Sequence, residues 1–238
     1  LLLVMVKAST RLSDIIFTNV QLINVISCFG IRLGIAEKTV KEVCEEYNID
    51  LKFFISIVNT YNDKDYFPDI DDIDVILLID YLEKTHLYYM NFTVPRINKL
   101  LSALEESLPD EKSVKHIKKY FNEYKLELKR HFDFEEDVLF PMISELVKNP
   151  ERRNHISDSA FKRLELEHSN VEDKLLDLKT ILVRFLPDNA DEQIVFELLS
   201  TVFWFENSHL NHARFEDKIL IPKLKDLILK VKNKESAK

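Results

Sequence analysis

Glycine is unusually scarce in this sequence: the chain of 238 residues has only two, Gly30 and Gly34. Average usage would give roughly 17. A dinucleotide-binding G-x-G-x-x-G loop needs three glycines, and a Walker P-loop needs two ahead of a Lys-Ser/Thr pair, so neither loop can be built here. Hairpin-rich β folds also depend on glycine in their turns. The scarcity therefore favours an all-α protein whose chemistry comes from side chains.

Cysteine is also scarce, and acidic residues outnumber basic ones. Cys28 and Cys44 are too few and too far apart for a disulfide scaffold or a C-x-x-C site, which favours a reducing compartment. The net charge of −8 disfavours a nucleic acid or an anionic membrane surface as partner. The apolar start of the chain is shorter than a signal-peptide core, and no later run reaches 18 apolar residues. We therefore expect a cytoplasmic protein with no nucleic-acid partner and no membrane partner.

The apolar periodicity divides the chain into two parts. Residues 1–65 are predicted to form a small N-terminal helical module, with short helical pieces at 20–29, 37–47 and 51–61. An aspartate-rich linker follows at 62–74. Four longer helical segments then occupy about 74–107, 110–147, 157–186 and 189–231, and their breaks fall at Pro109, Pro150 and Pro187. Because the connections are short, residues 74–231 are predicted to form an up-down-up-down four-helix bundle.

One motif, H-x-x-F-E-[ED]-x-[VI]-L-x-P, occurs twice in the predicted bundle. It spans His131–Pro141 on the second long segment and His212–Pro222 on the fourth. Each copy places a glutamate, Glu135 or Glu216, four residues after its histidine, so that both side chains lie on one face of a helix. A single pair of this kind is common on solvated helices, whereas two pairs in the same apolar setting indicate a shared site.

The first and third long segments each contribute one histidine within an apolar stripe, His86 and His168. Helix geometry places them with the motif. His86 and His131 lie about 21 residues on either side of the first interhelical turn, or roughly 32 Å each. His168 and His212 lie about 18 and about 24 residues on either side of the third turn. In an antiparallel bundle all four histidines therefore fall near one level.

Four imidazoles and two carboxylates that converge inside a bundle require a cation, since buried ionised carboxylates need pairing or coordination. Six mixed nitrogen and oxygen ligands do not fit a closed structural zinc site. They suit two iron ions, each with open positions, bridged by the carboxylates. Manganese, or a mixed iron–manganese pair, is equally compatible with these ligand types.

These residues resemble the hemerythrin-like superfamily, and more closely the repair-of-iron-centres family, also described as regulators of cell morphogenesis and nitric-oxide signalling. The resemblance covers residues 12–231. It implies a short N-terminal module, a hemerythrin-like four-helix bundle and a non-haem di-iron centre with bridging glutamates. The ligand positions that it implies are filled by His86, His131, Glu135, His168, His212 and Glu216.

The function that the resemblance implies is a response to nitrosative or oxidative stress, including repair of damaged iron–sulfur clusters. Nitric oxide or oxygen would be the small ligand, damaged iron–sulfur proteins would be the partners, and a homodimer is compatible with this function. Sensing of oxygen or nitric oxide, without catalysis, is the alternative, so enzymatic activity is left open.

The sequence departs from the family at two places. An oxygen-carrying hemerythrin has a second histidine four residues after the one on its third helix, and here that position is Glu172. The family's N-terminal module usually has a Cys-Cys pair before its glycines, and here Gly30 and Gly34 have no such pair beside them. The first departure disfavours simple oxygen carriage, and the second weakens any function that needs the thiol pair.

Other interpretations use the same residues differently. A ferritin-like carboxylate site would use the two E-x-x-H pairs Glu83–His86 and Glu165–His168, with Glu135 and Glu216 as lone acids. That assignment leaves the motif histidines His131 and His212 without a role. His209, one turn before His212, is a hydrogen-bonding neighbour of a ligand, a further ligand or part of a polar face. A helical interaction module without metal is the remaining alternative.

Overall fold

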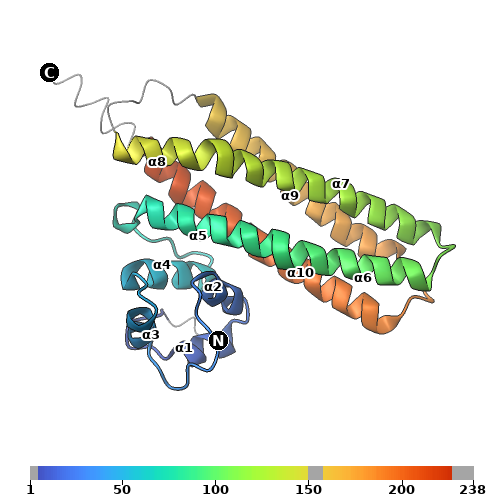
Figure 1. The fold of residues 1–238 in the computed structure, drawn as a ribbon, viewed down its shortest axis with the longest axis horizontal. Coiled ribbons are helices and arrows are strands. Elements are labelled where there is room, and N and C mark those ends of the chain that lie inside the picture. Colours follow the sequence, from blue (N-terminus) through green and yellow to red (C-terminus); the bar gives the residue numbers. More distant parts are fainter. Residues whose placement is uncertain (1–4, 150–157, 227–238) are drawn as a thin grey trace. The chain divides into compact units, whose positions relative to one another are not determined.

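The structure is a computed structural model that describes residues 5–149 and 158–226, with the side chains of 158–169 outside the description. The chain forms two compact units. One consists of Leu1–Thr85 with Arg214–Lys238, and the other of His86–Ala213. All regular structure in the described ranges is helical, and the one β-bridge joins Arg11 and Thr39 (Figure 1). The all-α prediction is therefore confirmed.

Four short helices open the first unit: α1 (Leu12–Thr18), α2 (Leu22–Cys28), α3 (Val40–Glu46) and α4 (Leu51–Asn62). Helices α2 and α3 lie within the predicted pieces and α4 ends one residue beyond its piece, whereas α1 was not located separately. Residues in the left-handed conformation end two of these helices. Gly30, with φ of +73°, follows α2, and the next N–H, of Ile31, bonds back to the Ile26 carbonyl at 3.0 Å. Asn48, with φ of +53°, follows α3 in the same conformation.

The N-terminal helices pack on aromatic residues from later in the chain. The Phe29 ring stacks on Tyr81 at 5.4 Å, and Tyr61 lies 5.6 Å from Phe215. The Tyr61 and Tyr81 hydroxyls are 3.0 Å apart. The first unit thus includes segments, residues 75–85 and 214 onward, that the sequence assigned to the bundle. The division into domains 1–65 and 74–231 stays a prediction.

Four long helical segments follow η1, a short turn at Ile70–Asp72. The first joins α5 (Val75–Tyr88), η2 (Tyr89–Thr93) and α6 (Val94–Ser107), and the second joins α7 (Lys112–Phe134), η3 (Glu135–Leu139) and α8 (Phe140–Lys148). The third is α9 (Asp158–Phe185), and the fourth joins α10 (Glu192–Phe215) and η5 (Glu216–Leu220). These bounds agree with the four predicted segments within a few residues, except that the predicted end of the fourth, at 231, lies outside the described residues. No helix in the described ranges has both the length and the apolarity of a bilayer-crossing segment.

Three of these segments contain a π-helical turn that sequence analysis did not predict: η2, η3 and η5. A proline follows the start of each turn by six residues, at Pro95, Pro141 and Pro222. Proline has no N–H, and its ring clashes with the carbonyl four residues earlier in an α-helix. The wider turn avoids this clash, because the residue before each proline donates its N–H to the carbonyl five residues back, at the turn's first residue.

The core of the unit His86–Ala213 is built from one apolar stripe on each helix. Its aromatic centre includes Tyr89, Phe121, Tyr124, Phe132 and Phe205, all almost fully buried. Helix α7 packs against both α6 and α9 in this unit. The Tyr124 hydroxyl is an exception in this core: it has no hydrogen-bond partner among the described atoms, and burial raises its pKa well above the ordinary value.

We predict that Tyr124→Phe stabilises the protein by about 1 kcal/mol, because it removes a buried hydroxyl that lacks a described partner. The matched variant Tyr81→Phe should lower the free energy of unfolding by about 1 kcal/mol, since it breaks the bond to the Tyr61 hydroxyl. Urea unfolding at equal metal content measures both. A loss of stability in Tyr124→Phe would contradict the prediction.

Candidate metal centre

Histidines and glutamates from three long segments are buried at the level predicted from helix lengths. His86 lies near the end of α5, His131 near the end of α7 and His212 near the end of α10. Glu135 and Glu216 are the first residues of the π turns η3 and η5, one helical turn after His131 and His212. All five side chains are at most 2% exposed.

The atoms of three of these side chains converge on one point. His86, Glu135 and His212 each offer a ligand-type atom within 4.8 Å of the others. The His86 Nε2 atom lies 3.0 Å from His212 Nε2 and 3.2 Å from Glu135 Oε2. Ligands about 2.1 Å from one ion are about 3.0 Å apart in octahedral geometry and about 3.4 Å apart in tetrahedral geometry. The observed separations therefore fit a single coordination sphere.

Glu136 sets the protonation of the His86 ring. Its Oε1 atom lies 2.8 Å from His86 Nδ1. A carboxylate only accepts hydrogen bonds, so Nδ1 donates, and Nε2 of the neutral ring then presents its lone pair. That lone pair points at the Glu135 carboxylate and at the second imidazole, His212. A cation at this point would be bound by the His86 lone pair and the Glu135 carboxylate together.

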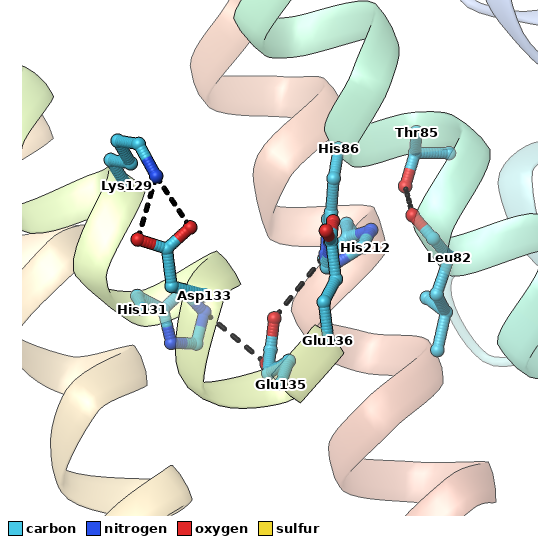
Figure 2. A network of polar contacts seen from close by, with 9 residues as sticks. All are labelled: Leu82, Thr85, His86, Lys129, His131, Asp133, Glu135, Glu136 and His212. Atoms are coloured by element: carbon cyan, nitrogen blue, oxygen red, sulfur yellow. Dashed lines mark hydrogen bonds and ion pairs between the residues drawn. The ribbon is translucent and has the colours of Figure 1, made fainter. Parts of the chain in front are cut away.

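The two oxygens of the Glu135 carboxylate face different histidines. Oε2 lies 3.2 Å from His86 Nε2, whereas Oε1 lies 3.4 Å from His131 Nε2. Figure 2 shows Glu135 between the two rings, with Glu136 beside His86. A carboxylate whose oxygens reach toward two separate nitrogen donors has the arrangement of a ligand that bridges two ions.

Aromatic rings enclose the His86 side of the site. Phe132 stacks on the His86 ring with centroids 4.0 Å apart and planes 14° apart, and Phe140 lies 5.9 Å away in nearly the same orientation. Tyr89 packs 6.0 Å from the His212 ring, and its hydroxyl lies 2.8 Å from the Ser208 hydroxyl. This wall keeps the imidazole orientation fixed and lowers the local dielectric, which strengthens any charge interaction within it.

The remaining sequence candidates divide into three groups. His168 and Glu165 lie on α9 within 158–169, so their side chains are outside the description. Glu83 is half-buried, and burial raises its pKa, but it is absent from the described group of converging ligand-type atoms. His209 is buried, with its ring centroid 6.2 Å from that of His212. Both motif histidines contact the described group: His212 is part of it, and His131 Nε2 lies 3.4 Å from Glu135 Oε1.

Glu136, Asp217 and Glu167 flank candidate ligands in the sequence, where an acid can orient a metal-bound imidazole. The structure shows this contact for Glu136, and its partner is His86 on another helix. The widened turns η3 and η5 were not predicted, and prolines inside otherwise regular helical periodicity were the available signal.

A bundle with buried histidines and glutamates gathered around a common point is a cation-binding helical protein. The family model of the hemerythrin HHE cation-binding domain matches residues 93–224 of the chain. This is more than half of the sequence, and the chain belongs to that family. The match includes both motif pairs and begins seven residues after His86. The predicted hemerythrin-like superfamily is thereby confirmed. No curated protein matches the chain.

We predict that Glu136→Ala weakens ferrous-ion binding about 10- to 100-fold, because the Nδ1–H partner that orients His86 is lost. The neighbouring exposed Asp137 provides the control, and Asp137→Ala should bind as wild type does. Anaerobic competition against a chelator measures both affinities. Equal affinity in all three proteins would remove Glu136 from the site.

Proposed function

We propose that this chain is a non-haem di-iron protein with the ligands His86, His131, Glu135, His168, His212 and Glu216. The observation that carries the proposal is the Glu135 carboxylate, whose oxygens lie 3.2 Å from His86 and 3.4 Å from His131. Glu216 repeats the burial of Glu135 and its four-residue spacing from a histidine. It is therefore the second expected bridge.

The donor set favours iron over the commoner structural metals. Calcium and magnesium prefer oxygen ligands, so the imidazole nitrogens argue against either ion. No cysteine is among the described converging groups, which argues against a structural zinc site. Mixed imidazole and carboxylate ligation with open positions is typical of non-haem iron. Manganese has similar preferences, so metal analysis of the purified protein belongs in the first experiment.

A bound pair of iron ions would supply open positions for nitric oxide or oxygen and would exchange electrons with them. The residues of this chain do the rest. Glu136 holds the proton at His86 Nδ1, which keeps Nε2 directed toward the centre. Phe132 and Phe140 exclude water beside His86. The two glutamates balance the positive charge within a buried site.

We further propose a role in the response to nitrosative or oxidative stress, with repair of damaged iron–sulfur clusters as the candidate activity. Such repair would use iron of the centre and not thiols. Burial raises the pKa values of Cys28 and Cys44 to about 12. The thiolate is the form that reacts and binds metal, so both cysteines are inert at neutral pH.

Sensing is the second candidate, and Arg214 favours it. Two residues after His212, this side chain donates hydrogen bonds to the Thr60 carbonyl at 3.3 Å and the Lys64 carbonyl at 2.6 Å, at the end of α4. A shift of α10 on ligand binding at His212 would thus be passed to the N-terminal helices through this residue. Sensing by this route requires no catalysis.

We expect the purified protein to contain about two iron ions per chain and to show an optical band that changes on anaerobic addition of nitric oxide. His131→Ala and His212→Ala should lose this iron, whereas Glu83→Ala should retain it. A colourless, iron-free protein refutes the di-iron proposal.

A second experiment separates repair from sensing. Recovery of a nitric-oxide-damaged cluster enzyme on adding the protein supports repair, and gas binding without recovery supports sensing.

We predict that both thiols react with a disulfide reagent at pH 8 more than about 100-fold slower in the native protein than in denaturant. With a pKa of about 12, the thiolate fraction at pH 8 is only about one in ten thousand. The native rate should rise with pH as the folded thiols ionise. Rapid native labelling at pH 8 would restore a thiol-based function.

A further inference from the structure

The unit His86–Ala213 contains a cavity of about 220 Å³ between α9 and α10, partly open to solvent. One water needs about 15 Å³ of such space, so the cavity holds several waters. A divalent cation with its inner hydration shell therefore fits inside it. The lining combines carboxylates with apolar side chains: Glu172, Asp173, Leu175, Leu176, Glu206, His209 and Leu210.

His209 lies between this cavity and the candidate metal ligands. Its side chain lines the cavity, yet it is only 1% exposed. On its other side, the ring centroid is 6.2 Å from that of His212 and 6.5 Å from that of His131. His209 therefore places an imidazole between the cavity and the candidate ligands, on a direct path for an ion that moves from one to the other.

The charge of the lining selects what enters. Glu172 and Asp173 contribute two carboxylates from α9, and Glu206 contributes a third from α10. Lys179 pairs with Glu206 at 2.5 and 2.7 Å. The lining residues themselves include three acids and no lysine or arginine. A negative, partly enclosed cavity concentrates cations and accelerates their entry. These charges do not attract a neutral gas such as nitric oxide or oxygen.

We propose that this cavity is the entry route by which a ferrous ion reaches the centre, and that His209 is a transfer residue that binds the ion in passing. The inference rests on the proposed di-iron centre. Carboxylates at Glu172 and Asp173 would collect the hydrated ion, and the His209 imidazole would take up one of its coordination positions as water is lost. The ion would then move to the permanent ligands one ring away.

The test measures the rate at which full-length metal-free protein takes up ferrous ion anaerobically, followed as ion still accessible to a chelator. Glu172→Gln with Asp173→Asn should slow uptake about tenfold at low ionic strength, and high salt should remove the difference, since salt screens the attraction. His209→Leu should slow uptake about tenfold or more at every ionic strength. All variants should reach the final iron content of wild type.

The control is Glu123→Gln, an exposed acid on α7 that does not line the cavity and should leave the rate unchanged. Circular dichroism confirms folding of His209→Leu, and the double variant carries the test independently because its residues are partly or fully exposed. Wild-type rates in both variants overturn the entry route while leaving the centre intact. Reduced final iron in His209→Leu also overturns it, because His209 is then a permanent ligand. A wild-type protein that binds no iron refutes the centre and the route together.

Discussion

The hydrogen bond between Glu136 and His86 Nδ1 is the interaction on which the site depends. This bond holds the proton of the buried imidazole on Nδ1. The lone pair of Nε2 therefore points toward Glu135 and His212. A carboxylate and two imidazoles thus meet inside an apolar wall, an arrangement that a bound cation would stabilise. The ring of Phe132 stacks on His86 and supports its orientation.

Two prolines shape the backbone next to the glutamates of the site. Pro141 and Pro222 stand six residues after Glu135 and Glu216, and each helix widens into a π turn that starts at the glutamate. A π turn contains one residue more than an α-helical turn, so it rotates the side chains that follow it around the helix axis. Pro95 has the same effect after Tyr89, although no glutamate occupies that turn. The motif therefore encodes a helix distortion as well as a pair of donors.

The same helices also take part in the unit that contains the N-terminal module. Residues 75–85 precede His86 directly, and residues 214–226 follow His212 after one residue. Tyr81, Phe215 and Arg214 pack or bond with the short helices α2 and α4 within that unit. Each of these two histidines therefore stands in the same helical segment as residues that pack within the N-terminal unit.

Much of this arrangement could be predicted from the chain alone. Helical periodicity and the prolines located the four segments, the repeated His–Glu spacing identified the motif, and the rise per residue placed His86, His131 and His212 at one level. Periodicity could not show how Glu135 divides its oxygens between two histidines, nor that Glu136 binds His86, 50 residues away in sequence. Those details depend on helix rotation and on contacts between helices distant in sequence. The sequence by itself determined which donors the bundle offers and their level, and only tertiary packing decided which atoms face one another.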